Sequence, residues 1–445
     1  MYPDTTLFIS IASYRDPELI ATLHDLIAQA HYPQRLRIAI CWQDDLKLDP
    51  FFAAGMVLEN TENHQGVILY TLIWQGVRVR LLALHYLKSQ GACWARHLAE
   101  TLYDEEHYFL QIDSHCRFIP HWDSEMIAML ESLRSKSPRP VLSSYPPAYT
   151  PGKDEKRASK VNRLFFKGIN KRRLVYFAPC SFEAEQPQRC GFLAAGFLFA
   201  EGHFVKNVRN DPQIFFMGEE IAMAARAWTY GYDIWSPHKV LLWHYYSRKI
   251  HPKVWQDHNT EAQKEGVVDL TWWQRDAIAQ KRIHTLLGFC DDPVDLGIYG
   301  LGQQRSLREF QYRIGIDFTS GKVHPDVYGP QRVTWFDTLP ATHQKWLQTL
   351  DHIHQRHWHL EKGKIDINQN DVSWWHLGVY TADNQPLFIQ QLSPEEFQKK
   401  LKPINEEITE LKILFKTAFP APAHSMRLCH YSLDTGWGEV MEQSW

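Results

Sequence analysis

The sequence lacks the features that mark several large classes of protein. Among its 445 residues, the Lys+Arg total of 48 nearly balances the Asp+Glu total of 51, which leaves a formal net charge of −3. The chain therefore has no overall basic field to hold nucleic acid or an anionic membrane surface. Its seven cysteines form an odd set without CxxC spacing, so neither a disulfide framework nor a thiolate zinc site is indicated.

Long apolar runs and export signals are also missing. The N-terminus carries no basic segment followed by a long apolar one. The longest nearly apolar stretch, 191–200, is about half of the ~20 residues that span a bilayer. We therefore expect a cytoplasmic protein with no membrane span. Charged residues make up 22% of the chain and hydrophobic residues 44%, which argues against wholesale disorder.

Aromatic residues and histidine are what the sequence has in excess. Aromatic residues make up 13% of the chain, including 17 Trp, and there are 23 His. Such side chains line many sugar-binding and other ligand-binding surfaces, and they also fill aromatic-rich cores. Composition alone supports both interpretations.

Short apolar runs alternate with helical patterns in the first part of the chain. The expected strands and helices are 7–12, 36–42, 77–81 and 108–113 (strands), and 19–27 and 92–103 (helices). This alternation predicts an α/β fold with a mostly parallel sheet, in which ligands bind beyond the carboxyl ends of the strands. Asp113 would lie at such an end.

The pattern changes twice further along. Residues 145–187 contain Pro-rich turn signals and a run of Lys and Arg, so we expect a long basic loop, either a solvated surface loop or a lid that faces acceptor or phosphate. After about residue 335 the chain is rich in Trp, His and Gln. With a length that predicts two or three domains, we place a main domain at 1–335 and a small C-terminal accessory domain of β or α+β character at 336–445.

An Asp-x-His motif ends the strand expected at 108–113. Asp113 and His115 can each bind a divalent cation, which an enzyme that releases a nucleoside diphosphate needs against the charge of the leaving group. Asp-Ser-His alone is more often a turn, but its place after a buried strand favours a metal site. His244, at a later strand end, would be the third ligand; the alternative is a histidine packed among aromatic residues.

Four further residues have both a functional and a structural interpretation. Arg248 would face a phosphate or form a surface salt bridge. Glu219 and Glu220 open an expected helix, where they complement the helix dipole or hold acceptor or sugar hydroxyls near the anomeric carbon. Gly196 allows close approach of the backbone to a ligand, or simply tight packing.

Several motifs, in order along residues 6–315, resemble one known family. They are Ser10–Pro17, the strand that carries Gln43, Gly91–Arg96, Leu110–Phe118 with Trp122-Asp123, Ala195–Phe197, Gly218–Glu220, Thr229–Asp233, His244–Tyr246 and Gly302 with Arg305–Arg308. These motifs resemble the polypeptide-hydroxyproline α-N-acetylglucosaminyltransferases. The resemblance implies a GT-A fold with a Rossmann-like mixed sheet, UDP-GlcNAc as donor, Mn²⁺ or Mg²⁺, and retention of the anomeric configuration. The Asp-x-His motif and the later His are also similar to the metal set of the mucin-type polypeptide N-acetylgalactosaminyltransferases.

The resemblance also implies roles for single residues. Asp113, His115 and His244 would bind the metal, and Glu219 or Glu220 would lie near the acceptor as catalytic candidates. The residues expected to bind the donor are Ser10, Ala12, Tyr14, Arg15, Arg96, Asp113, Gly196 and Arg248. The basic loop and the accessory domain have no counterpart in the family, which leaves the acceptor open.

We therefore expect a metal-dependent retaining glycosyltransferase that moves GlcNAc from UDP-GlcNAc to a hydroxyl group of hydroxyproline, Ser or Thr in a protein. The acceptor would approach the face from which UDP leaves, and the β-phosphate oxygen would take its proton; double displacement through Glu219 or Glu220 is the alternative. Two other hypotheses remain open. One is the same fold acting on a glycan or small molecule, and the other is a non-catalytic carbohydrate-binding protein that uses the Trp-rich C-terminal segment.

Overall fold

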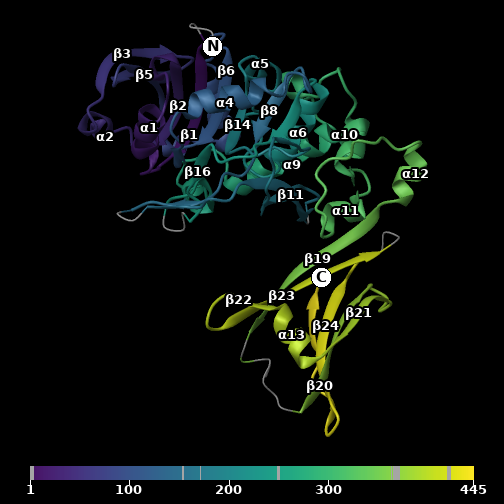
Figure 1. The fold of residues 1–445 in the computed structure, drawn as a ribbon. Helices are drawn as coiled ribbons and strands as arrows, with labels where there is room; N and C mark the ends of the chain where they lie inside the picture. Colours follow the sequence, from purple (N-terminus) through teal and green to yellow (C-terminus); the bar gives the residue numbers. More distant parts are fainter. Residues whose placement is uncertain are drawn as a thin grey trace. The chain divides into compact units, whose positions relative to one another are not determined.

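The structure, a computed structural model, describes residues 5–152, 155–170, 172–247, 251–361, 363, 371–417 and 422–445. The chain divides into two compact units, residues 1–319 with 326–340, and residues 320–325 with 341–445 (Figure 1). The helices are α1 (Leu19–Ala28), α2 (Asp49–Ala53), α3 (Ala92–Glu100), α4 (Trp122–Glu131), α5 (Phe204–Asn207), α6 (Glu219–Thr229), α7 (Val254–Asp257), α8 (Thr260–Lys264), α9 (Trp272–Leu286), α10 (Leu307–Ile314), α11 (Pro325–Tyr328), α12 (His343–Gln348) and α13 (Pro394–Lys400).

A large mixed sheet forms the centre of the first unit. Its strands, in spatial order, are β13 (Gln188–Arg189), β15 (Asp233–Ser236), β8 (Pro140–Ser143), β14 (Phe197–Glu201), β6 (Tyr108–Asp113), β1 (Leu7–Tyr14), β2 (Leu36–Asp44), β5 (Val77–His85), β4 (Val67–Trp74) and β3 (Val57–His64). Strands β6, β1, β2 and β5 run parallel, whereas β14 runs antiparallel to both β6 and β8. This arrangement confirms the expected α/β class and the Rossmann-like mixed sheet of a GT-A fold.

The central strands are continuous apolar runs because they are buried on both faces. Ile9, Ile11, Leu110 and Ile112 are fully buried, and α1 and α4 contribute to the same core. Such burial leaves only the strand ends open to a ligand. The register aligns Ala12 of β1 with Asp113 of β6, so the two carboxyl ends lie side by side.

The first unit also contains smaller strands. They are β7 (Cys116–Phe118), β9 (Tyr149–Thr150), β10 (Lys156–Arg157), β11 (Asn162–Ile169), β12 (Val175–Ser181), β16 (Leu242–His244) and β17 (Ile316–Asp317). Strand β16 pairs with β7 in antiparallel register, which places His244 opposite Cys116. Residues 145–187 are not one long loop as expected, because β11 and β12 form a hairpin within them. Leu164, Phe166 and Gly168 are buried and alternate with more exposed neighbours, which accounts for that hairpin; Arg163 and Lys167 among those neighbours obscured it in the sequence.

The second unit is mainly β structure with short helices, which confirms the expected β or α+β character. Its strands are β18 (Lys322–Val323), β19 (Asp351–Glu361), β20 (Val372–Tyr380), β21 (Pro386–Leu392), β22 (Leu401–Pro403), β23 (Ile408–Thr417), β24 (Ser425–Ser432), β25 (Gly436–Trp437) and β26 (Met441–Ser444). Trp358, Trp375, Phe397 and Phe415 belong to its core, so part of the C-terminal aromatic excess serves packing. No helix in the described part of the chain combines the length and the apolar character that a membrane span requires.

Candidate functional site

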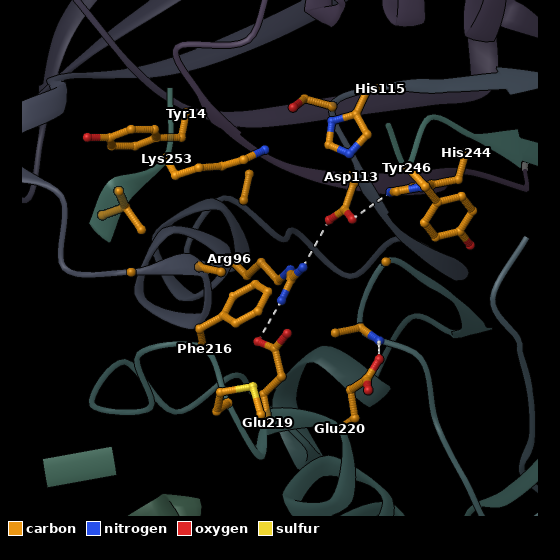
Figure 2. A pocket seen from close by; sticks show the side chains of 18 of the residues that line it. Tyr14, Arg96, Asp113, His115, Phe216, Glu219, Glu220, His244, Tyr246 and Lys253 are labelled. Carbon is orange, nitrogen blue, oxygen red and sulfur yellow. Dashed lines mark hydrogen bonds and ion pairs between the residues drawn. The ribbon is translucent and has the colours of Figure 1, made fainter. Parts of the chain in front are cut away.

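A cavity of about 550 Å³ opens at the carboxyl ends of β1 and β6 (Figure 2). Its wall comes from four kinds of segment: these strand ends, the start of α3, the turn before β14, and the start of α6. The lining also includes residues 252–255, the Tyr145 loop, Gln43 of β2, residues 175–177 of β12 and residues 244–246. The cavity is therefore where the parallel sheet predicts a ligand.

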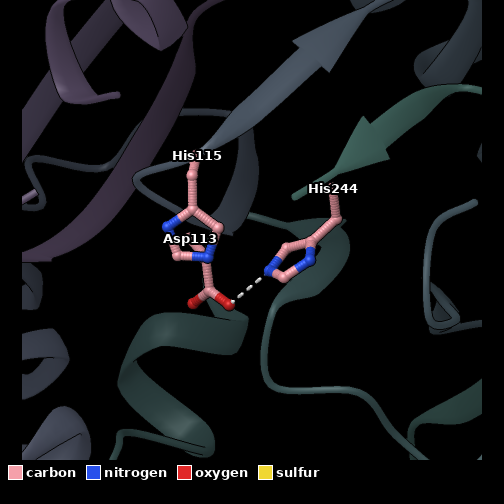
Figure 3. Close-up of side chains that lie close together, drawn as sticks. All are labelled: Asp113, His115 and His244. Atoms are coloured by element: carbon pink, nitrogen blue, oxygen red, sulfur yellow. Dashed lines mark hydrogen bonds and ion pairs between the residues drawn. The ribbon is translucent and has the colours of Figure 1, made fainter. Parts of the chain in front are cut away.

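Asp113, His115 and His244 meet beside this cavity (Figure 3). One ligand atom of each lies within 4.8 Å of the other two. His244 Nε2 is 3.1 Å from Asp113 Oδ2, and the two imidazole rings meet edge to face with centroids 4.6 Å apart. Burial alone would raise the pKa of Asp113, but the hydrogen bond from His244 and the charge of Arg96 hold it well below its usual range. The carboxylate is therefore ionised.

Asp16 fixes the orientation of His115. Its Oδ2 lies 2.7 Å from His115 Nδ1 and accepts a hydrogen bond of 2.6 Å from the Ser114 hydroxyl. Burial lowers the pKa of His115 despite the hydrogen bond to Asp16. The ring is thus neutral with Nδ1 protonated, which leaves Nε2 as the nitrogen available to a metal.

The three side chains fit a divalent cation. Two imidazole nitrogens and one carboxylate oxygen form a donor set that suits Mn²⁺ better than the purely oxygen-seeking Mg²⁺. Nδ1 of His244 is buried and has no partner among the described residues, so only the second nitrogen of this ring is engaged, by Asp113. The residues expected to be ligands are therefore gathered with their donor atoms facing one another.

Arg96 links the metal-site carboxylate to the acidic start of α6. Its guanidinium donates to Asp113 Oδ1 at 3.0 Å and to Glu219 Oε2 at 2.8 Å, and it is only 3% exposed. The Cys93 thiol donates to the same Glu219 oxygen at 2.6 Å. Burial opposes the charge of Arg96, but the two carboxylates more than offset this and raise its pKa. A permanent cation thus lies between two carboxylates at the cavity.

Glu220 has a separate set of contacts. Its Oε2 accepts a 2.6 Å hydrogen bond from the Tyr145 hydroxyl, and its Oε1 accepts a 3.1 Å hydrogen bond from the Ala195 N–H. Burial raises the pKa of Glu220 to about 7, although the Tyr145 hydrogen bond works in the opposite direction. This carboxyl can therefore hold or release a proton near neutral pH.

The structure places most of the remaining candidate donor residues around the cavity. Ala12, Tyr14 and Gly196 line it together with the residues above, and a Cβ at Gly196 would lie 2.8 Å from Asp113 Oδ2. Ser10 does not reach the lining, because it is fully buried within β1.

Neither of the other two candidate arginines, Arg15 and Arg248, is among the described residues that line the cavity. Arg15 adopts the left-handed conformation with φ of 45° and pairs with Asp257 at 2.9 Å, outside the lining. Arg248 lies outside the described residues.

Sequence reasoning did not single out the aromatic side of the cavity. Tyr145, Phe216 and Trp255 line it, and the Phe216 and Trp255 rings meet at a centroid distance of 5.8 Å. They come from separate loops and no motif connects them. Two omissions were detectable in the sequence: Asp16, a carboxylate next to a strand end inside the Ser10–Pro17 motif, and Tyr246, which ends the His244–Tyr246 motif and also lines the cavity.

Comparison with known proteins places the first unit among enzymes of sugar transfer. The family model "Glycosyltransferase (GlcNAc)" matches residues 6–320. None of the curated proteins compared with the chain matches it. Among solved structures, GalNAc-T7 with UDP, GalNAc and Mn²⁺ aligns with 69% of this chain and 54% of its own at 14% identity and a TM-score of 0.41, so this chain spans about half of that protein. S. aureus TarS 1-349 aligns with 63% of this chain and 72% of its own at 12% identity and a TM-score of 0.35.

Proposed function

Because the chain belongs to the GlcNAc glycosyltransferase family, we propose that it transfers N-acetylglucosamine from UDP-GlcNAc to a hydroxyl group with retention of the anomeric configuration. The observation that carries this proposal is the Asp113, His115 and His244 cluster at the edge of a cavity of about 550 Å³. The first unit is the catalytic domain in this proposal, and the second unit is accessory.

Asp113, His115 and His244 would hold Mn²⁺. Bound there, the cation supplies positive charge against the diphosphate that leaves with UDP. The protein's own contribution is to keep the three ligands ready: Asp16 orients His115, and Arg96 keeps Asp113 ionised. Ala12 and Tyr14, at the end of β1, would lie on the nucleotide side of the same cavity.

The donor sugar would lie against the charged row formed by Asp113, Arg96 and Glu219. Sugar hydroxyls donate to carboxylates and accept from guanidinium groups, so this row can fix the orientation of a hexose ring. Gly196 adds no side chain beside this row, where even a Cβ would lie 2.8 Å from the Asp113 carboxylate. The role of these residues is therefore to bind and orient the anomeric carbon.

The contacts of the two glutamates favour direct transfer over a covalent intermediate. Glu219 Oε2 already accepts from Arg96 and Cys93, which lowers its readiness to attack a carbon. Both oxygens of Glu220 accept hydrogen bonds as well. In the reaction we propose, the acceptor hydroxyl forms the new bond to the anomeric carbon as the bond to UDP breaks, and its proton passes to the departing β-phosphate oxygen. Glu219 and Glu220 would hold sugar and acceptor hydroxyls.

For the acceptor we propose hydroxyproline, Ser or Thr in a protein. The open side of the cavity carries the apolar side chains of Phe216, Met217 and Trp255, which are 42%, 38% and 39% exposed. An exposed apolar rim is suited to a polypeptide that flanks the reacting hydroxyl with its own side chains. We place the reaction in the cytoplasm, since none of the seven cysteines, all within the described residues, forms a disulfide.

Donor hydrolysis tests the proposal. Purified enzyme is incubated with UDP-GlcNAc, UDP-GalNAc and UDP-glucose, with Mn²⁺ or with a chelator, and UDP release is measured. We expect release from UDP-GlcNAc with Mn²⁺ and a loss of at least about 100-fold in Asp113→Asn, since the charge facing the cation is removed. Asp276→Asn, which removes a buried carboxylate of α9 outside the cavity, is the control and should retain activity.

Three results would count against this assignment. Absence of release from every UDP-sugar would refute transfer, and full activity of Asp113→Asn would refute the metal site. Mass spectrometry of host proteins for HexNAc on hydroxyproline, Ser or Thr tests the acceptor, and glycan modification alone would refute the protein acceptor.

A further inference from the structure

A buried chain of side chains runs from the end of α3 to the turn that forms one wall of the cavity. It begins at Glu100, passes through Asn210 and Gln111, and ends at the carbonyl of Ala195. Glu100, Asn210 and Gln111 are 2%, 1% and 0% exposed. None of the three lines the cavity, so none of them would touch a substrate there.

Each link of this chain is a hydrogen bond of defined direction. Glu100 accepts from Asn210 twice, at Oε2 from the backbone N–H at 3.0 Å and at Oε1 from Nδ2 at 2.6 Å. The same Asn210 Nδ2 donates to Gln111 Oε1 at 2.8 Å. Gln111 Nε2 then donates to the Ala195 carbonyl at 2.7 Å.

The two ends of this chain of hydrogen bonds set the direction of every link. At the far end the Ala195 carbonyl can only accept, and at the near end both Glu100 oxygens accept from Asn210, one from its backbone N–H and one from Nδ2. Burial raises the pKa of Glu100 to about 7, whereas the two hydrogen bonds from Asn210 favour its ionised, accepting form. Asn210 therefore presents its NH₂ group to Glu100. Both hydrogens of that NH₂ group are then used, one on Glu100 and one on Gln111. Gln111 must therefore accept from Asn210 and turn its own NH₂ group toward Ala195. Asn210 Oδ1 is buried and has no partner among the described residues. This direction of the hydrogen bonds therefore leaves one buried acceptor unsatisfied.

The far end of the chain is a functional part of the cavity wall. Ala195 and Gly196 form the turn between the bridged residues Ala194 and Phe197, and both line the cavity. The N–H of Ala195 donates to Glu220, while Gly196 lies against the carboxylate of Asp113. Gln111 thus holds Ala195 at its carbonyl group, and Glu220 holds it at its N–H group.

We propose that Gln111 and Asn210, oriented by Glu100, are positioning residues that hold the Ala195–Gly196 turn at the distance from Asp113 and Glu220 that a bound donor sugar requires. The inference rests on the proposed function for its kinetic consequence. The nucleotide part of the donor would not depend on this chain of hydrogen bonds. Among the described residues, the side chains of the three metal ligands and of the end of β1 form no hydrogen bond with the side chains of Gln111, Asn210 or Glu100.

Exchanging the carboxylate and the amide between positions 100 and 210 tests the proposal. In the double variant Glu100→Gln/Asn210→Asp, the amide at 100 accepts from the backbone N–H of 210 and donates to the carboxylate at 210, so the buried charge and the number of polar groups are kept. The carboxylate at 210 can then only accept from Gln111. Gln111 turns its NH₂ group toward it, and its oxygen faces the Ala195 carbonyl.

We expect this reversal to loosen the turn while the fold persists. Hydrogen exchange of peptides covering 191–197 should be about tenfold faster than in the wild-type protein. The affinity for UDP-GlcNAc should fall about tenfold, and the affinity for UDP alone should change less than about twofold. Gln311→Glu, which keeps the oxygen that accepts from the Phe318 N–H, is a matched buried control and should change none of these quantities.

The outcomes are distinguishable. Unchanged exchange and unchanged UDP-GlcNAc affinity in the folded double variant would overturn the inference, because a purely space-filling role tolerates the reversal. Faster exchange at 191–197 in a protein that binds no UDP-sugar would support the positioning of the turn and refute the proposed function. If the double variant does not fold, Gln111→Met, which removes the hydrogen bonds of Gln111 to Asn210 and to the Ala195 carbonyl, carries the same expectation.

Discussion

Replacement of Arg96 by Met should destabilise the first unit strongly. Arg96 is 3% exposed and is the partner of both Glu219, at 2.8 Å, and Asp113, at 3.0 Å. Breaking a buried ion pair by removing one partner leaves an uncompensated charge and costs about 3–5 kcal/mol. The Glu219 side chain is only 7% exposed and contributes most of this cost, whereas Asp113, at 26%, is partly screened by solvent.

The expected loss is large enough to measure by thermal unfolding. At about 2 °C per kcal/mol for a large domain, 3–5 kcal/mol corresponds to a decrease of about 6–10 °C in Tm. The double variant Arg96→Met/Glu219→Gln should recover more than half of the loss, since one of the two uncompensated charges is gone.

A surface arginine provides the control. Arg78 pairs with Glu59 at 3.1 Å, but both side chains are about half exposed, at 57% and 43%, so Arg78→Met should cost less than about 1 kcal/mol. A Tm for Arg96→Met equal to that of Arg78→Met would refute the conclusion that Arg96 compensates two buried carboxylates.

Three further substitutions test individual contacts of the site. Gly196→Ala places a Cβ 2.8 Å from Asp113 Oδ2, so the carboxylate must move and Mn²⁺ affinity in calorimetry should fall about tenfold; unchanged affinity would show that this wall is not tight. Asp16→Ala removes the acceptor that orients His115, so we expect Mn²⁺ affinity to fall about 10–100-fold. Equal Mn²⁺ affinity in the variant and the wild-type protein would contradict this role of Asp16. Glu220→Gln tests the effect of this carboxyl on stability. Burial raises the folded-state pKa of Glu220 from 4.5 to about 7, so the folded protein binds this proton more tightly than the unfolded chain does. The stabilisation that follows is fully present below pH 4.5 and is lost as the pH rises through 7. Chemical denaturation should therefore find Glu220→Gln more stable than wild type by about 3 kcal/mol at pH 8 and equal to it near pH 4, and a difference that does not change with pH would contradict this.

The parts of the fold that the sequence predicts are those whose burial leaves a periodic pattern. Strands β1, β2 and β6 are apolar along their whole length because both faces are covered, and they were expected at these positions. Strand β3 was not expected, since nearly all of its residues are exposed and it carries no apolar alternation. The β11–β12 hairpin was missed because its outward-facing positions carry the basic residues that suggested a loop.

The candidate site was predictable only in part, for a related reason. Asp113 and His115 are two residues apart after a buried strand, so local sequence already places them together. His244 was found by its own strand end, and the pairing of β16 with β7 brings it to them. Tyr145, Phe216 and Trp255 carry no such local signal, because three separate loops converge on the cavity. The direction of the hydrogen bonds that connect Glu100, Asn210 and Gln111 likewise depends on contacts between residues up to 110 positions apart.

The reversal of strand direction between β6 and β14 determines which wall of the cavity can vary. Where neighbouring strands are parallel, each is followed by a loop that can lengthen or change without disturbing the sheet. At the β14 side the chain instead enters the sheet through the two-residue turn of Ala195 and Gly196, pressed against Asp113. Insertions there would fill the cavity itself. New acceptor preferences in relatives of this chain should therefore arise in the Phe216 and Trp255 segments, whereas the Ala195–Gly196 turn should keep its length.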